Sequence, residues 1–247
     1  MSAISDLWNF LTTPDNWTGT TGIWTLTRAH LWISFVAVTI ACAIAIPSAV
    51  VLAHRRIAPV ASVAIVNVGR AMPSFAIIAL VLPFSIRWGF GLGFWPTTVA
   101  LVALGIPPIY TNTYAGVAGT PSDLVEAAEG VGMTGRQVLF KVEIPFALPL
   151  LLTGFRVSSV QIIATATLGA LVGYRCLGTL VLDGLARPRT AGDRLIGGAF
   201  LVALLAVLVE LALNRAEVRL LPWNRRVDGS RRRRRRADEP APRPLDV

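Results

Sequence analysis

The sequence contains little charge, cysteine or histidine, and each scarcity argues against a class of protein. Only 15% of its 247 residues are charged, whereas a soluble domain has about 25% charged residues. The two cysteines, Cys42 and Cys176, are far apart and form no CxxC pair, so we interpret them as small packed apolar residues rather than metal or redox ligands. The HExxH pattern of zinc proteases is also missing.

Phosphate-binding sequence is absent as well. No GxxxxGK(S/T) pattern occurs, so the chain cannot hold the phosphates of ATP in a P-loop. Ser158 and Ser159 have no histidine near them in sequence, which argues against an intramembrane serine protease. No long hydrophilic stretch remains for a soluble ligand-binding domain. We therefore expect a chain that is not an enzyme and that holds no metal or cofactor.

Apolar residues dominate the rest of the chain. They make up 54% of it, with a mean hydropathy of +0.62, and several runs reach the roughly 20 residues that a helix needs to cross a bilayer. We place the spans at residues 31–53, 60–86, 97–118, 147–172 and 195–213. The sequence thus predicts an all-α membrane protein with about five transmembrane helices in one membrane domain, residues 26–213.

Basic residues indicate the direction of the spans, because cytoplasmic loops are enriched in Lys and Arg. A His-Arg-Arg triplet at residues 54–56 closes the first span, so we expect the N-terminus outside, with residues 1–25 as an extracytoplasmic or interfacial arm. An arginine run at residues 231–236 follows the last span and places the C-terminus in the cytoplasm. The outer segment 173–194 carries four arginines against this rule.

Prolines interrupt two of the predicted spans. We expect the second span to be one helix kinked at the Met72-Pro73 step, with two shorter segments as the alternative. Arg70 in this span either reaches back to the cytoplasmic surface or faces protein or water. The pair Pro107-Pro108 is expected to break the third span in its middle.

The longest break in apolar sequence between the first and last spans covers residues 126–149 and predicts two short helices around a turn. Thr120 can cap the first helix, with Asp123 at the third helical position. Gly130 and Gly132 can supply the positive φ that ends it.

The second helix of this break begins with another capping box, formed by Thr134 and Gln137. Pro145 is expected to end it, because the residue before a proline avoids the α region. Two capped helices outside the membrane suit a segment that a partner grips, and an ordinary cytoplasmic loop is the alternative.

The residues of this segment carry a resemblance. The order Glu126-Ala127-Ala128, then Gly132, then Val142-x-Ile144-Pro145 resembles the EAA motif of permease subunits of ATP-binding cassette (ABC) importers. The resemblance implies a type I ABC importer permease fold and a coupling loop at residues 120–147. It also implies ATPase coupling through Glu126, Ala127, Ala128, Gly132 and Pro145.

Three further stretches narrow the resemblance to one subfamily of these permeases. Residues 72–80, 110–116 and 164–173 look like segments of permeases that import osmoprotectants such as glycine betaine, carnitine, choline or proline. Arg70 replaces a usual Gln, and residues 174–176 replace a run of small residues, so a different small solute such as methionine or an oxyanion is the alternative. A stand-alone secondary transporter is a further alternative, but paired intramembrane carboxylates are missing from the sequence pattern.

The resemblance also implies partners and a location. We expect two ATPase subunits that bind ATP and Mg²⁺, a second permease that is identical or homologous, and an extracytoplasmic solute-binding protein. The arginine run fits anionic membrane lipids rather than nucleic acid. The protein is therefore expected as a multi-pass protein of the cell membrane, whether inner or plasma membrane.

Polar and helix-breaking residues within the spans are candidates for the translocation path. These are Pro73, Ser74, Tyr110, Asn112, Gln161, Thr165 and Thr167. For the last three, hydrogen bonding between helices is the alternative role. Arg156, in the first third of the fourth span, is expected to extend its side chain toward the cytoplasm.

The tail at residues 214–247 is basic, and after Trp223 it is charged and rich in proline with almost no apolar residues, so we expect it to be disordered and cytoplasmic. Truncation after Asn224 should therefore leave solute uptake nearly intact, as measured with labelled solute in cells that express equal amounts of inserted protein. Complete loss of uptake by a truncated chain that still inserts would contradict this expectation.

Overall fold

The structure, a computed structural model, describes residues 3–57, 64, 73–188 and 191–220. These ranges are helical and contain no strand, which confirms the all-α prediction. The elements in order are α1 (Ala3–Thr12), a 3₁₀ turn (Pro14–Asn16), α2 (Ile23–His54), α4 (Ser74–Arg87), α5 (Phe94–Ala118), α6 (Ser122–Gly130), α7 (Gly135–Val138), a π-helical turn (Leu139–Glu143), α8 (Ile144–Thr165), a 3₁₀ segment (Ala166–Val172), α9 (Gly178–Ala186) and α10 (Gly192–Leu220).

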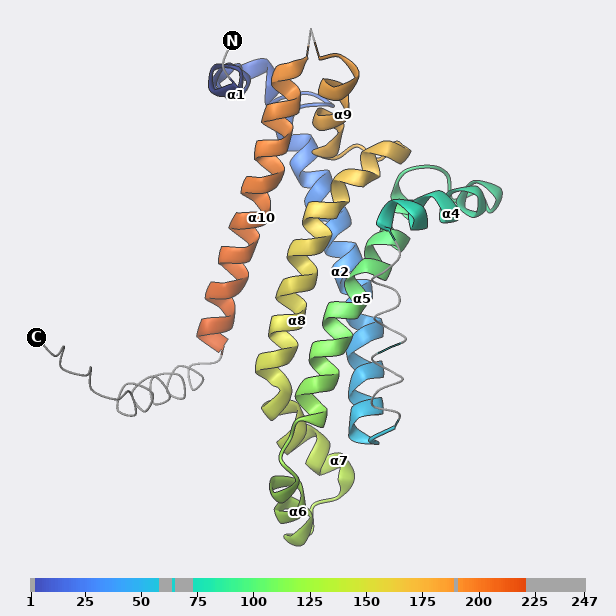
Figure 1. The fold of residues 1–247 in the computed structure, drawn as a ribbon, viewed down its shortest axis with the longest axis vertical. Coiled ribbons are helices and arrows are strands. Elements are labelled where there is room, and N and C mark those ends of the chain that lie inside the picture. Colours follow the sequence, from blue (N-terminus) through green and yellow to red (C-terminus); the bar gives the residue numbers. More distant parts are fainter. Residues whose placement is uncertain (1–2, 58–63, 65–72, 189–190, 221–247) are drawn as a thin grey trace, which may run out of the picture.

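Four helical stretches in the described residues are long and apolar enough to cross a membrane: α2, α5, the continuous stretch that contains α8, and α10. In Figure 1, α2, α5 and α8 run side by side, and α10 runs along the other side of α8. The helices α6 and α7 lie at one end of this bundle, and α1 and α9 lie at the other. The fold thus separates the predicted coupling loop from the N-terminal arm by the full length of the bundle.

Small residues allow α2 and α5 to approach closely. An alanine recurs every fourth residue on one face of α2, at Ala41, Ala45, Ala49 and Ala53, and each of these is buried. They pack with buried side chains of α5, including Ile109. Because helices in lipid associate through close packing of small residues rather than through hydrophobicity, this alanine face defines how the two helices meet.

Glycines allow α5 and α8 to approach equally closely. A Cβ added at Gly154 would lie 2.8 Å from the carbonyl oxygen of Pro108, and one added at Gly116 would lie 2.9 Å from the Cβ of Ala147. Only a residue without a side chain fits these contacts. The core that carries the predicted coupling loop is therefore a tightly packed layer of α2, α5 and α8.

The prolines of α5 do not break it, contrary to our expectation. The helix continues through Pro107 and Pro108 from Phe94 to Ala118. Side chains one turn later bond to the proline carbonyls: Thr111 Oγ1 donates to Pro107 O at 2.7 Å, and Asn112 Nδ2 donates to Pro108 O at 2.8 Å. Membrane helices tolerate proline where neighbouring helices and polar side chains support the backbone in this way.

Pro145 does not end a helix either. The backbone runs without interruption from α7 through the π-helical turn into α8, and Pro145 lies in the first turn of α8. A π-helical turn shifts the hydrogen-bond register of a helix, and it lies directly before the proline, whose missing N–H would otherwise disrupt that register. The second helix of the predicted loop is thus the end of a membrane helix rather than a separate element.

The second predicted span does not run as one kinked helix through Pro73. Pro73 has φ −60° and ψ 127°, an extended conformation, and α4 begins at the next residue. This helix has 14 residues, too few to cross a bilayer alone, and it runs across the end of α5 in Figure 1. Most of the stretch before Pro73, including Arg70, lies outside the described residues.

The helices of the first and last predicted spans, α2 and α10, are longer than predicted, because helical hydrogen bonds continue beyond the apolar run. Helix α2 begins at Ile23, so His30 lies within it and not at its end. Helix α10 continues to Leu220, so the first part of the expected tail is helical, and residues 221–247 lie outside the description. The expected arm is not free either, since α1 packs on α10 with Phe10 against Gly197.

Candidate coupling segment

Residues 120–147, here called the coupling segment, begin with a turn instead of the predicted cap. The N–H of Thr120 donates to Val117 O at 3.2 Å, so Thr120 still belongs to the turn that ends α5. Pro121 is the N-cap of α6, and no side chain caps the helix. The predicted capping box of Thr120 and Asp123 is therefore wrong.

The turn after α6 depends on one glycine. Gly132 has φ +84°, as predicted, whereas Gly130 is still helical. The N–H of Gly132 donates to Glu129 O at 2.8 Å, which closes the turn. Since side chains rarely adopt this left-handed conformation, the entry into α7 requires glycine at this position.

The capping box at the start of α7 is confirmed. The N–H of Gln137 donates to Thr134 Oγ1 at 3.4 Å, and the N–H of Thr134 donates to Gln137 Oε1 at 2.8 Å. Two of the free N–H groups at the helix start are thereby satisfied. The turn between α6 and α7 is fixed from both sides.

The EAA residues of α6 differ in their exposure to solvent. Ala128 is buried, whereas Glu126 and Ala127 are exposed. Large apolar side chains are exposed beside them, with Leu124 45% and Val131 77% accessible. An exposed apolar surface with a carboxylate next to it is typical of a protein-binding site rather than of a free loop.

A cavity of about 270 Å³ lies behind α6 and is lined by polar groups of three elements. Its lining residues are His54, Arg56, Ser122, Val125, Glu126, Glu129, Val138 and Glu143. Within it, His54 Nδ1 lies 2.5 Å from Glu143 Oε2. Sequence reasoning missed this contact, because the two residues are 89 positions apart and neither belongs to a recognised pattern.

The predicted path residues are dispersed in this structure. Pro73 and Ser74 begin α4, Tyr110 and Asn112 belong to α5, and the remaining candidates, Gln161, Thr165 and Thr167, lie at or just beyond the end of α8. Their role in translocation therefore stays a prediction.

Three of these candidates already have partners within the chain, including Asn112 through its bond to Pro108 O. Tyr110 is buried and stacks on Tyr114 with ring centroids 6.1 Å apart. Thr167 Oγ1 donates to Ala164 O at 3.0 Å, a bond within its own segment and not the interhelical bond that we considered.

A charge cluster between α8 and α10 was also missed. Arg156 of α8 does not extend freely toward the cytoplasm, because it contacts three residues of α10. Its guanidinium lies 3.6 Å from Glu210 and 3.3 Å from Glu217, and it donates to Asn214 Oδ1 at 3.0 Å. Opposite charges on two helices fasten α10 to α8 at this level.

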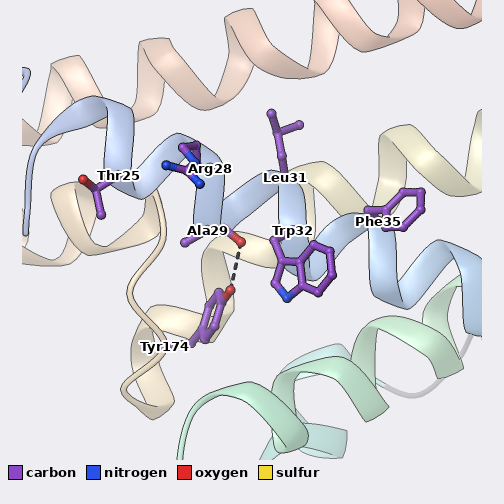
Figure 2. A pocket seen from close by; sticks show the side chains of 7 residues that line it. All are labelled: Thr25, Arg28, Ala29, Leu31, Trp32, Phe35 and Tyr174. Atoms are coloured by element: carbon purple, nitrogen blue, oxygen red, sulfur yellow. Dashed lines mark hydrogen bonds between the residues drawn. The ribbon is translucent and has the colours of Figure 1, made fainter.

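The largest cavity among the described pockets, about 610 Å³, opens on the half of α2 that is remote from the coupling segment (Figure 2). It is lined by Thr25, Arg28, Ala29, Leu31, Trp32, Phe35 and Tyr174. The Tyr174 hydroxyl donates to Ala29 O at 2.9 Å across its edge. No predicted path residue lines this cavity.

A bundle of membrane-length helices with an exposed helical segment at one end defines an integral membrane transport subunit. The sequence identifies the family of this subunit. The model of the family described as "Binding-protein-dependent transport system inner membrane component" matches residues 41–222. The chain belongs to this family.

Individual relatives agree with this assignment. The chain is 37% identical over 196 residues to the "Carnitine transport permease protein OpuCB" of Listeria monocytogenes, covering 79% of this chain and 87% of the relative. It is 35% identical, over the same shares, to the "Glycine betaine/carnitine/choline transport system permease protein OpuCB" of Bacillus subtilis (strain 168). The fold resembles an inward-facing MetNI methionine ABC transporter with a TM-score of 0.68 at 23% identity, covering 79% of this chain and 94% of that one. The predicted ABC importer permease fold is thereby confirmed.

Proposed function

We propose that this chain is the membrane-spanning subunit of an ABC importer for betaine-type quaternary-amine osmoprotectants. The observation that carries the proposal is identity of 33–37% with permeases whose names specify carnitine, choline, glycine betaine or osmoprotectants. The methionine transporter shares the fold at 23% identity, and this likeness supports no particular solute.

A separate ATPase would bind ATP and Mg²⁺ and dock on the coupling segment. The exposed Glu126 and Ala127, with the apolar side chains beside them, suit a cleft in such a partner. Gly132 and the capping box that follows hold α6 at a defined angle to α7. Closure of the ATPase dimer would then move the segment as a rigid body and shift the spans between inward-open and outward-open packings.

The same placement supports a proposed orientation in the membrane. The coupling segment lies at the end of the bundle where α2 terminates in its basic triplet at residues 54–56, whereas α1 lies at the opposite end (Figure 1). Positive charge at the coupling end supports a cytoplasmic coupling segment and C-terminus, with the N-terminus outside. A second permease, identical or homologous, and an extracytoplasmic binding protein complete the proposed importer, with membrane lipids around it.

Competition for uptake tests the solute. In proteoliposomes that contain the whole transporter, unlabelled carnitine and choline should reduce the uptake of labelled glycine betaine when its binding protein and ATP are supplied. Methionine and sulfate should not, because neither presents the quaternary ammonium group that we propose is recognised. Vesicles without the ATPase serve as the control, and uptake of methionine in place of betaine would contradict the proposal.

A further inference from the structure

The contact of His54 with Glu143 joins the end of one membrane helix to the coupling segment. His54 is the last residue of α2, and Glu143 is the last residue of the π-helical turn before α8. The Glu143 side chain is 9% exposed and that of His54 is 28% exposed. Because a carboxylate accepts hydrogen bonds, the Nδ1–H of His54 donates to Oε2 of Glu143.

The carboxylate of Glu143 has no other hydrogen bond or ion pair among the described residues. A carboxylate that is nine-tenths buried needs such a partner, because a buried charge without one is strongly unfavourable. The contact therefore fixes the position of the π-helical turn relative to α2 and is more than a surface ion pair.

The imidazole also faces the start of α7. A Cβ added at Gly135 would lie 3.8 Å from His54 Nε2, so the ring lies between the first residue of α7 and the end of the π-helical turn. Glu126 and Glu129 of α6 line the same cavity. One side chain of α2 thus lies beside the π-helical turn and the start of α7, and it shares a cavity with α6.

Helix α2 is in turn bound firmly to the core. Its alanine face packs on α5 along much of its length, and its contacts with α5 are among the most extensive in the fold. A displacement of the π-helical turn that reaches His54 would therefore be passed to α2 and α5 together, through contiguous packed groups.

We infer that His54 is a positioning residue that fastens α2 to the coupling segment, so that both move as one body in the transport cycle. This inference rests on the proposed function, in which an ATPase moves the coupling segment. Along the chain, the turn at residues 119–121 joins α6 to α5 and not to α2. The contact between His54 and Glu143 therefore links the docking site to α2 in a way that the backbone does not.

The first test compares single variants in the complete transporter in proteoliposomes, with ATP hydrolysis and uptake measured together. His54→Ala should lower the solute imported per ATP hydrolysed by about fivefold, the effect of losing roughly 1 kcal/mol of coupling. His54→Gln, whose amide can still donate to Glu143, should stay within about twofold of wild type. Val51→Ala is the matched control, because Val51 lies one turn before His54 on α2, is exposed and does not belong to the coupling segment. An unchanged ratio in His54→Ala, with wild-type Tm, would overturn the inference.

A second test asks whether the two elements move together or part. Cysteines replace His54 and Glu143 in a chain that lacks Cys42 and Cys176, and a short bifunctional methanethiosulfonate bridges them. The bridged transporter should import more solute per ATP than the same protein after reduction. If bridging stops import and reduction restores it, α2 must separate from the coupling segment, and the inference is wrong.

These outcomes remain distinct from failure of the proposed function. If the wild-type transporter does not import betaine, the solute proposal fails by itself. The inference about His54 is then judged by stimulation of ATP hydrolysis by the binding protein, compared between variant and wild type, which does not require the solute to be betaine.

Discussion

Gly132→Asp is expected to abolish most solute uptake while the chain still inserts and folds. Gly132 has φ +84° and open space around it, so the substitution causes no clash with the rest of the protein. The cost is conformational, about 1–2 kcal/mol for a side chain in the left-handed region. That energy does not unfold a bundle of packed helices, but it favours another turn and tilts α6 away from its docking angle.

A change of 1–2 kcal/mol corresponds to roughly a 5- to 30-fold change in an association equilibrium. We therefore expect co-purification of the ATPase and uptake to fall together by about that factor. Gly130→Ala is the matched control, because Gly130 is helical and also has open space around it. It should retain full uptake, since alanine is the better helix former.

Glu126→Lys should act at the same step through charge. Glu126 is exposed on α6, so its reversal does not disturb the apolar packing of the spans but presents a cation to the surface that accepts a carboxylate. Normal ATPase association together with normal uptake in both Gly132→Asp and Glu126→Lys would show that this segment is not the coupling element.

Gly154→Leu is expected to prevent assembly of the core. The Cβ alone would lie 2.8 Å from the carbonyl oxygen of Pro108 and 2.8 Å from the Cβ of Asn112, and the first of these is backbone that cannot rotate away. Helices α5 and α8 must therefore separate, with loss of the close packing that holds membrane helices together. Overpacking of this kind costs about 1–3 kcal/mol for small additions, and leucine adds three more carbons.

Thermal unfolding in detergent measures this effect. Gly154→Ala should lower the Tm by about 3–10 °C, and Gly154→Leu should yield little folded protein on size-exclusion chromatography. Gly192→Ala is the control, because a Cβ there meets nothing within 4 Å. A wild-type Tm for Gly154→Leu would show that α5 and α8 do not approach closely at this point.

Features set by neighbouring residues were predictable from the sequence. The capping box of Thr134 and Gln137 and the positive φ of Gly132 each depend on a few consecutive residues, and both predictions are confirmed. The predicted cap at Thr120 failed because Thr120 remains bonded to the end of α5, a competition that the capping pattern alone does not reveal.

Proline was the main source of wrong boundaries. Its effect on an isolated helix predicts breaks at Pro107-Pro108 and at Pro145, but the surrounding protein supports the backbone at both places. Pro73 is extended, and α4 begins directly after it, so here the expected helix does not continue through the proline. Whether a proline breaks a membrane helix depends on its neighbours in space, which one sequence does not show.

Contacts between distant residues could not be predicted for the same reason. His54 with Glu143, and Arg156 with the acidic residues of α10, join positions that share no motif or spacing. The sequence predicts that the coupling segment is a docking element, but the contact of His54 with Glu143 appears only when the helices are packed.

The partners of Arg156 have a consequence for biogenesis. Because synthesis proceeds from the N-terminus, α8 emerges from the ribosome with an arginine whose carboxylate partners have not yet been made. Glu210 and Glu217 arrive only with α10, the last membrane helix in the described chain. Arg156 alone would be an unpaired charge within its span, so the ion pairs with Glu210 and Glu217 favour placement of α10 once α8 is present. The cluster thus favours an order in which α8 is placed first and α10 then pairs with its arginine.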